Sequence, residues 1–371
     1  MQEQFILHPD KIICFYCSTD IGNLCNSAFL LCAYMMIVCG LTPEQAYAPF
    51  IDLTPMFAPY RDAGYGPATY HITVFECLRS LNISIKLGFI NIQNFDLEEY
   101  EFYEKIENGD LNWITKKFVA MAVPKENLNS QSLDSANQSM VKTAMNAPIY
   151  SVSDIKYLAQ WMLDNNIHTV IRLNNITYNK KNFTDQGIEH YDLYFPDGTT
   201  PSESILLKFL EICETRPGPI AVHCKAGLGR TGLLISCFLM KHYGLKASEV
   251  IAFLRIIRPG SVVGPQQNFL EKIQNNLWKQ RPSTPLPKSI SCYYEPFNVE
   301  ITRFGEKPSG IMTGLDVNIK DYINENSVVE NLVSQSVPIQ PRKAKMGFLK
   351  TLNLNLFKEI ISKPFEGENN K

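Results

Sequence analysis

The chain has 371 residues, of which 45% are hydrophobic and 19% charged, and its 35 lysines and arginines nearly balance its 37 acidic residues to leave a net charge of −2. A chain of this length and composition predicts a globular protein of roughly two to three domains. The near-neutral charge excludes a protein whose whole surface attracts nucleic acid or an anionic membrane, so we expect no nucleic-acid partner and no membrane insertion.

The first 40 residues predict a strand followed by a buried helix. They lack the basic head and long apolar run of a secretory signal, and the apolar stretch at residues 28–40 is too short to span a bilayer. The ten cysteines of the chain are scattered singly, which indicates a reducing, intracellular compartment. The strand predicted at residues 11–17 carries Cys14 and Cys17, which we interpret as buried thiols; a redox or metal-binding C-x-x-C pair is the alternative.

An acidic stretch, FDLEEYEFYEKIENGD, occupies residues 95–110. If it is helical, Glu98, Glu101 and Glu104 lie along one face, because residues three apart are neighbours on a helix. Like charges on one face repel each other, so this arrangement suits a cationic partner; a solvated helix face is the alternative. The Ser-, Asn- and Gln-rich segment that follows predicts a flexible connection.

Strands and helices alternate after this connection. Strands that alternate with helices are typical of an α/β sheet covered on its faces, and we predict that class here. The pattern of apolar residues predicts helices over 151–166, 230–244 and 246–260 and strands over 168–173, 189–195 and 218–224.

The strand–helix–helix pattern occurs twice. A shift of 204 residues (234 − 30) places the helical run from Leu30 over the run from Leu234, with a β-rich run before both and a Gly-Pro after both. This order favours a duplicated domain over a chance match of two amphipathic pairs. The first copy is predicted to be inactive, because at this shift the positions of Cys224 and Arg230 are occupied by Asp20 and Asn26.

The segment VHCKAGLGRTG, residues 222–232, carries two competing signatures. Its glycines have the G-x-G-x-x-G spacing of a dinucleotide-binding turn, but no acidic residue stands at a strand end about twenty positions later. Cys224 and Arg230 form C-x-x-x-x-x-R, the spacing of a thiolate nucleophile enclosed by a phosphate-binding loop. The second interpretation accounts for more of the residues, and we adopt it. A buried cysteine beside a surface arginine is the remaining alternative.

The residue types in this loop suit phosphate chemistry. Backbone N–H groups of a loop that curls before a helix bind an oxyanion, and the same field stabilises a Cys224 thiolate. Arg230 offers a planar fork for phosphate oxygens, and Thr231 offers a hydroxyl to the leaving sulfur. His223 is expected to brace the loop. The predicted phosphate-binding residues are Lys225, Ala226, Gly227, Leu228, Gly229 and Arg230.

This chemistry also needs an acid for the leaving oxygen and a base for the attacking water. Asp197 is the candidate, because it lies on the loop LYFPDGTTP directly after a predicted strand; an ordinary Asp-Gly turn is the alternative. Gln266 and Gln267, at the start of a helix, are candidates for orienting the water, and ordinary polar residues at a helix start are the alternative. No metal or cofactor is expected.

Together these stretches resemble the cell-division-cycle dual-specificity phosphatases, which reverse proline-directed, cyclin-dependent kinase phosphorylation. The resemblance rests on APYRDAGYG, the acidic stretch and the segments around Asp197, Cys224 and Gln266, and it covers residues 11–278. It implies two tandem protein-tyrosine-phosphatase-like domains, each a central sheet flanked by helices, of which the first is degenerate. The expected ranges are 1–124 for the inactive domain, 125–145 for the linker, 146–282 for the catalytic domain and 283–371 for a largely disordered regulatory tail.

The resemblance also implies an activity. The expected enzyme is a cysteine-dependent phosphatase for phosphoserine, phosphothreonine and phosphotyrosine, with Cys224 as nucleophile, Arg230 as phosphate clamp and Asp197 as general acid. It would prefer phosphoserine-proline sites followed by basic residues in phosphoproteins. A role in mitotic exit, cytokinesis or cilium regulation is implied, with a location in the nucleus, the cytoplasm or at the centrosome, spindle or basal body. A non-catalytic phosphopeptide-binding scaffold is the rival hypothesis.

A basic peptide substrate requires an acidic groove. The residues predicted to form it are Glu101, Tyr103, Glu104 and Asp110, with the tyrosine available to pack on the substrate proline. Tensin-like phosphoinositide phosphatases have a similar loop but carry a second lysine at the position of Leu228, so an inositol lipid fits less well.

Both ends of the chain carry further expectations. The tail sequence Gln340-Pro341-Arg342-Lys343 resembles a substrate with glutamine in place of phosphoserine, and we interpret it as a segment that returns to the groove; a basic linker is the alternative. Family members usually have a longer segment before residue 11, so the first domain is expected to be trimmed or the start of the chain incomplete.

Overall fold

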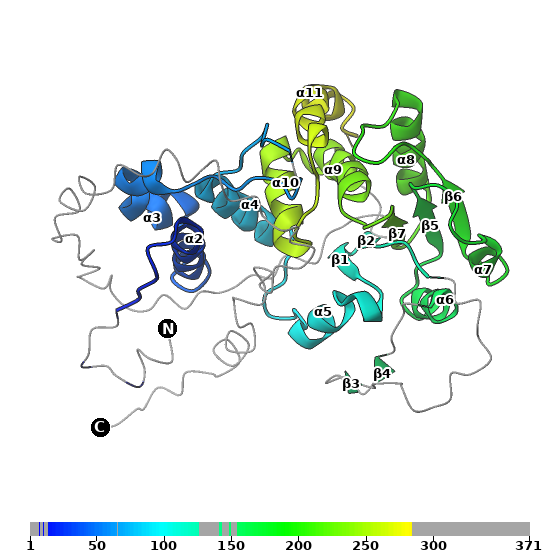
Figure 1. The fold of residues 1–371 in the computed structure, drawn as a ribbon, viewed down its shortest axis with the longest axis horizontal. Helices are drawn as coiled ribbons and strands as arrows, with labels where there is room; N and C mark the ends of the chain where they lie inside the picture. Colours follow the sequence, from blue (N-terminus) through cyan, green and yellow to red (C-terminus); the bar gives the residue numbers. More distant parts are fainter. Residues whose placement is uncertain are drawn as a thin grey trace.

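The chain folds around a five-stranded mixed sheet with helices on both faces, which confirms the predicted α/β class (Figure 1). The computed structural model describes residues 14–64, 66–125, 141–142, 148–149 and 154–283, together with residues 7 and 10. The sheet contains β1 (Leu111–Thr115), β2 (Phe118–Met121), β5 (Thr169–Arg172), β6 (Glu189–Asp192) and β7 (Ile220–His223). Their order is β1-β2-β7-β5-β6, and only β1 and β2 are antiparallel to each other. A separate two-stranded ladder joins β3 (Val141–Lys142) and β4 (Pro148–Ile149).

The α-helices are α2 (Ile21–Ile37), α3 (Pro43–Tyr47), α4 (Val74–Lys86), α5 (Leu97–Tyr103), α6 (Ile155–Asp164), α7 (Lys181–Thr184), α8 (Glu203–Thr215), α9 (Gly229–Tyr243), α10 (Ala247–Ile257) and α11 (Pro265–Lys279). Two 3₁₀ helices, η1 (Ala48–Met56) and η2 (Ile106–Asn108), complete the described set. The helices predicted over 151–166, 230–244 and 246–260 are confirmed as α6, α9 and α10. No helix in the described ranges is long and apolar enough to cross a membrane.

The central strands separate two hydrophobic cores. Every residue of β2, β5 and β7 is buried, as expected for strands covered on both faces. Successive side chains point to opposite faces, so Phe118 and Ala120 join one core while Val119 and Met121 join the other. The first core contains residues of α8, α9, α10 and α11, and the second contains residues of α5, α6 and α7.

Helix α9 runs through the first core. Every residue from Arg230 to Met240 is buried, because the helix contacts the sheet on one side and α8, α10 and α11 on the others. The helix ends at Gly244, whose φ of +71° is a left-handed cap conformation that favours glycine. At its other end the helix begins at Gly229, within the candidate loop that follows β7.

The N-terminal half, residues 14–110, packs against the outer side of α10. Helices α2 and α4 share the first core with α9 and α10. The Phe89 ring lies 4.9 Å from the Tyr243 ring and 5.4 Å from the Phe253 ring. The Tyr100 hydroxyl donates a hydrogen bond to the carbonyl of Ile257, at the end of α10. The halves therefore share a continuous apolar core, with polar contacts beside it.

The strand predicted over residues 11–17 is not observed at residues 14–17, while residues 11–13 lie outside the described ranges. Cys14 and Cys17 are exposed, so our interpretation of them as buried thiols was wrong. A strand needs a hydrogen-bonding neighbour, and among the described residues between 14 and 110 the only ladder contact is a single bridge between Tyr60 and Ile72.

The sheet continues across the predicted domain boundary at 124/125. Strands β1 and β2 precede that boundary, yet β2 pairs in parallel with β7 from Phe118–Ile220 to Met121–His223. The β1–β2 hairpin lies within the range expected for the first domain, yet it contributes two strands to the sheet that carries the candidate loop. The expected linker is described only at residues 125 and 141–142, and the expected tail only at residue 283.

Candidate active site

The candidate loop, residues 224–230, lies between the carboxyl end of β7 and the first turn of α9. Cys224 follows β7 directly and is only 2% exposed. The N–H groups that begin a helix have no partner within the helix, so the start of the 15-residue α9 is suited to an anion. The strand, loop and helix therefore place a buried thiol beside the N-terminal end of a helix.

Gly227 allows the loop to lie against the end of β2. Its φ is +67°, and a β-carbon at this position would lie 2.0 Å from the carbonyl oxygen of Met121. The loop is also tied to the segment after β2, since the N–H of Val123 donates to the carbonyl of Lys225 at 3.1 Å. Both the backbone conformation and the space available restrict this position to glycine.

Arg230 is buried and oriented by backbone carbonyls. It is 3% exposed, and its Nη1 donates to the carbonyls of Leu173, at 3.2 Å, and Phe195, at 2.8 Å. Its Nε lies 3.3 Å from Oδ1 of Asp197, whose side chain is 66% exposed. The structure thus brings the predicted phosphate clamp and the predicted general acid into contact while leaving the acid accessible.

Thr231 carries a buried hydroxyl at the start of α9. The residue is fully buried, and its Oγ1 finds no hydrogen-bond partner among the described residues. Buried hydroxyls are nearly always paired, so an unpaired one beside a candidate site is available to a reacting group. This position agrees with its predicted role near the leaving sulfur.

The two predicted glutamines have different surroundings. Gln266 lies against the loop, because its Oε1 is 3.0 Å from where a β-carbon on Gly229 would stand. Its Oε1 accepts the N–H of Val263 at 3.1 Å, and its Nε2 donates to the carbonyl of Thr199 at 3.2 Å, two residues after Asp197. The side chain of Gln266 therefore links the candidate loop to the loop of the predicted acid.

Gln267 has both amide atoms engaged in the turn before α11. Its Oε1 accepts a hydrogen bond from Arg255 Nη2 at 2.6 Å, and its Nε2 donates to the carbonyl of Gly264 at 3.1 Å. The amide atoms of Gln266 are also hydrogen-bonded, but of the two side chains it is Gln266 that lies against Gly229 in the candidate loop. The position of Gln267 therefore suits support of this turn better than contact with a water molecule at the loop.

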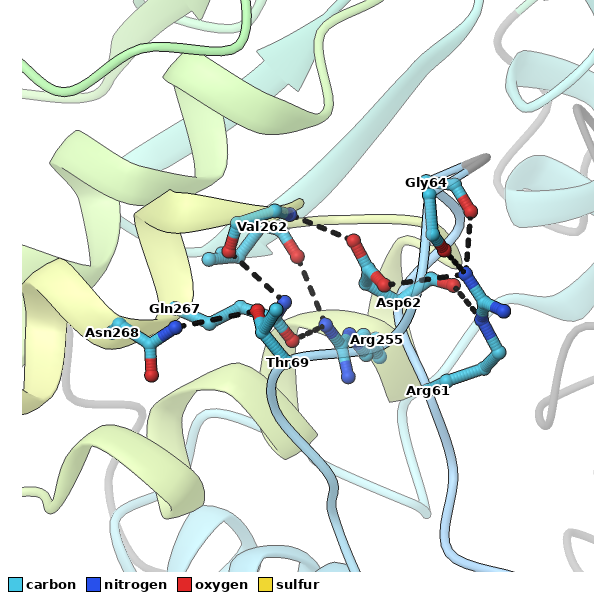
Figure 2. Close-up of polar contacts among 10 residues, drawn as sticks. Arg61, Asp62, Gly64, Thr69, Arg255, Val262, Gln267 and Asn268 are labelled. Atoms are coloured by element: carbon cyan, nitrogen blue, oxygen red, sulfur yellow. Dashed lines mark hydrogen bonds and ion pairs between the residues drawn. The ribbon is translucent and has the colours of Figure 1, made fainter.

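This turn, residues 261–267, is strained and firmly held. Val262 is a β-branched residue with a φ of +59°, which costs on the order of 1–3 kcal/mol. Arg255 donates to the carbonyl of Val262 at 2.9 Å (Figure 2). It also donates to the carbonyl of Ser261 at 3.1 Å. The N–H of Val262 donates to the carbonyl of Leu228 in the candidate loop. The surroundings thus maintain a conformation that the backbone alone does not favour.

His223 braces the loop as a neutral side chain. Its Nδ1 faces the carbonyl of Cys224 at 3.2 Å, so Nδ1 carries the proton and Nε2 accepts from the Tyr178 hydroxyl at 2.6 Å. That hydroxyl in turn accepts a hydrogen bond from His190 Nε2 at 2.9 Å. Burial lowers the pKa of His223 to about 3 and that of His190 to about 4, so both rings stay neutral at physiological pH.

Arg258 supports the loop from outside, and our sequence analysis did not identify it. It is buried, and its guanidinium donates to the carbonyls of Gly227, at 2.8 Å, and Ala226, at 3.0 Å. It also donates to Asn112 Oδ1 at 2.7 Å and to Asp110 Oδ1 at 3.1 Å. Because these loop carbonyls point towards Arg258, the N–H side of the loop faces away from it.

Two predicted groove residues have other contacts. Asp110 forms an ion pair with Arg258, so its carboxylate binds the residue that supports the loop. Tyr103 is buried against Trp161, with ring centres 5.4 Å apart, and cannot pack on a substrate proline as we expected. Its ring lies in the second hydrophobic core, because this side of α5 packs against apolar residues such as Trp161. Glu101 and Glu104 are half-buried, at the end of α5 and directly after it.

The described ranges contain no group of three or more histidine, cysteine, aspartate or glutamate residues that could hold a metal ion. The predicted tail segment, residues 340–343, lies outside the described ranges.

Family models and known proteins match both halves of the chain. The family model of the N-terminal half of dual specificity protein phosphatases matches residues 4–84, and that of the dual specificity phosphatase catalytic domain matches residues 140–276. The chain is 45% identical to mouse dual specificity protein phosphatase CDC14B over 72% of the chain and 52% of that protein. It is 37% identical to human dual specificity protein phosphatase CDC14A, over 98% of the chain and 61% of that protein. It is 41% identical to Saccharomyces cerevisiae tyrosine-protein phosphatase CDC14, over 81% of the chain and 54% of that protein. The chain thus spans about half to three fifths of the length of these relatives.

Substitution of Gly227 tests the contact between the loop and β2. We expect Gly227→Ala to abolish oxyanion binding, because the new β-carbon would overlap the Met121 carbonyl and displace the loop. Gly198→Ala is the matched control, since its φ of +70° is similar but no atom lies within 4 Å of the added carbon. Tungstate binding by calorimetry should be lost in Gly227→Ala and kept within about threefold in Gly198→Ala, whose strain is confined to one residue. Equal loss in both variants would contradict the contact.

The burial of His223 predicts a pH dependence of stability. Below the ordinary histidine pKa of about 6.5 the unfolded chain binds a proton at this ring, whereas the folded chain does so only near pH 3. The free energy of unfolding therefore decreases as the pH is lowered through this interval. The contribution has a slope of up to about 1.4 kcal/mol per pH unit, which His223→Asn should remove. Urea unfolding between pH 6.5 and 5.5 measures it, with exposed His71→Asn as the control. An unchanged slope in His223→Asn would contradict this assignment.

Proposed function

The chain belongs to the CDC14 dual-specificity phosphatase family, and we propose that it is a cysteine-dependent protein phosphatase with Cys224 as its nucleophile. The observation that carries the proposal is the juxtaposition of three chemical groups at one loop. A buried thiol stands at the start of α9, Arg230 lies in the same loop, and Asp197 contacts Arg230 at 3.3 Å while remaining exposed. Together these groups can supply a nucleophile, an oxyanion clamp and a proton donor.

In the first step, the Cys224 thiolate attacks the phosphorus of the bound phosphate ester. The S–P bond forms as the P–O bond to the substrate breaks, and the protonated carboxyl of Asp197 gives its proton to the leaving oxygen. The N–H groups of the loop and the guanidinium of Arg230 stabilise the negative charge on the other phosphate oxygens. The exposed carboxylate of Asp197 can reach a leaving group that enters from solvent.

In the second step, water attacks the phosphorus of the phosphocysteine. The S–P bond breaks, the sulfur leaves as a thiolate beside the Thr231 hydroxyl, and the Asp197 carboxylate accepts the proton of the water. We assign the orientation of this water to Gln266. Its contacts with Gly229 and with the carbonyl of Thr199 place it between the loop and the acid.

We further propose that the substrates are phosphoproteins with phosphoserine followed by proline and a basic residue. The resemblance to phosphatases that act on proline-directed sites supports this preference, as does the course of the chain from Glu101 to Asp110. The last residue of this acidic segment, Asp110, accepts a hydrogen bond from Arg258. Arg258 also donates to the carbonyl of Gly227 in the loop. Glu101 and Glu104 thus belong to an acidic segment that leads to the loop.

The resemblance further supports action in cell division on proteins phosphorylated by proline-directed kinases. The proposed location is the nucleus, the cytoplasm or the centrosome, spindle or basal body.

The catalytic roles predict distinct losses of activity. Cys224→Ser should show no turnover of either p-nitrophenyl phosphate or a phosphoserine peptide, whereas Cys39→Ser, at an exposed free cysteine, should be unaffected. Asp197→Ala should slow the peptide by about 10²–10⁴-fold, the usual contribution of a general acid. It should slow p-nitrophenyl phosphate less, because nitrophenolate leaves without a proton. Turnover that survives in Cys224→Ser would refute the mechanism, and a wild-type chain that binds phosphopeptide without turnover would favour the scaffold hypothesis.

The substrate preference predicts a ranking of peptides. We expect kcat/KM to fall at least about tenfold when proline after phosphoserine is replaced by alanine, the equivalent of about 1.4 kcal/mol. Replacement of the following lysine by glutamate should reduce it further. In the double variant Glu101→Gln, Glu104→Gln this lysine preference should shrink, while Glu44→Gln, at a remote exposed position, should retain it. Equal kcat/KM for all peptides would contradict the proposed substrate class.

A further inference from the structure

A loop of the N-terminal half, described at residues 57–64 and 66–72, lies against the turn that carries Gln266. Figure 2 shows Asp62 between Arg61 and the Val262 backbone. The Asp62 carboxylate accepts the backbone N–H of Gly264 at 2.7 Å, a length typical of a charge-assisted hydrogen bond. Two further contacts join the same segments: Asn268 donates to Thr69, and Tyr70 donates to Glu271.

The Asp62 carboxylate is buried and its position is fixed. The side chain is only 5% exposed, and Arg61 Nη2 lies 3.9 Å from its second oxygen. Arg61 also donates to the carbonyls of Gly64, at 2.7 Å, and Gly66, at 2.6 Å, so it closes the loop around the carboxylate. Burial lowers the pKa of the nearby Arg255 guanidinium, and the negative charge of Asp62 opposes this effect. A buried carboxylate that accepts a backbone hydrogen bond and lies beside Arg61 is a built contact rather than a surface encounter.

The hydrogen bond from Gly264 holds a residue on which both glutamines depend. Gly264 has a φ of +56° and a ψ of −131°, a combination essentially restricted to glycine. Its carbonyl accepts the Gln267 side chain, and the N–H of the preceding Val263 is the donor to Gln266 Oε1. If the backbone at Gly264 relaxes, the Gln266 amide loses its position against Gly229.

We propose that Asp62 is a positioning residue through which the catalytically degenerate half places Gln266 for hydrolysis of the phosphocysteine. This inference rests on the proposed function and assigns the N-terminal half a part in its second step. The carboxylate does not touch the reacting atoms: it holds Gly264, and Gly264 fixes the turn. Formation of the phosphocysteine depends on Cys224, Arg230 and Asp197 and is not expected to need Asp62.

The test separates the two chemical steps. An aryl phosphate labelled in its phosphate group is mixed with the full chain at saturation and quenched in acid, and the trapped phosphocysteine is measured together with kcat. We expect Asp62→Ala to lower the rate of phosphocysteine hydrolysis about tenfold and to raise the trapped fraction, since small misplacements of a positioned group cost one to two orders of magnitude. A second variant, Asp62→Asn, keeps an oxygen acceptor without the charge, so we expect a smaller decrease of about threefold.

Arg79→Ala is the matched control. Its side chain forms another contact between the two halves, 3.3 Å from Glu249, but on α4 and α10 away from the turn. It should leave the trapped fraction and kcat unchanged. Circular dichroism and thermal unfolding verify that each variant is folded.

Each outcome has one meaning. If either folded Asp62 variant hydrolyses the phosphocysteine at the wild-type rate, or if both steps slow equally, the inference is overturned. If the wild-type chain shows neither turnover of the aryl phosphate nor trapped phosphocysteine, the proposed function itself fails, which is a different result from the failure of Asp62.

Discussion

The site depends on one constraint: the carbonyl side of the 224–230 loop must be held from outside. Arg258 binds the carbonyls of Ala226 and Gly227, and Gly227 lies against the carbonyl end of β2. Since carbonyls and N–H groups of a tight loop point in opposite directions, this support leaves the N–H groups free for an oxyanion. The β1–β2 hairpin and Asn112 are therefore as necessary to the loop as the residues within it.

The parts of the site that the sequence predicted are those determined locally. To identify the motif from Cys224 to Arg230 in a sequence, one needs only the motif itself, a strand before it and a helix after it. The pattern of apolar residues predicted both elements. The support from Arg258 joins residues 146 and 148 positions apart, and no local pattern indicates such pairs. Tyr103 shows the same limit. Spacing placed glutamates on one side of α5, but only the packed structure shows that the neighbouring aromatic side is buried against Trp161.

The inactive copy is retained as a packing partner. It has Asp20 and Asn26 where the second copy has Cys224 and Arg230, yet α2 and α4 share a core with α9 and α10. Interfaces with a continuous apolar core do not allow free rotation between domains. Residues of the inactive copy therefore contact two segments of the catalytic half. Tyr100 binds the end of α10 and Asp62 binds the turn before α11, although neither residue takes part in the reaction directly.

The pairing of β2 with β7 has a consequence for how the chain is made. The two strands start 102 residues apart (220 − 118), so β2 leaves the ribosome long before its parallel neighbour exists. At a synthesis rate of about 5–20 residues per second, the edge of β2 that will bind β7 waits roughly 5 to 20 s. During this interval a fully apolar strand presents unpaired N–H and carbonyl groups, which is a template for pairing with another chain. The pairing of β2 with β7 supports the loop, and the interval before this pairing is one in which the nascent protein is exposed to misassembly.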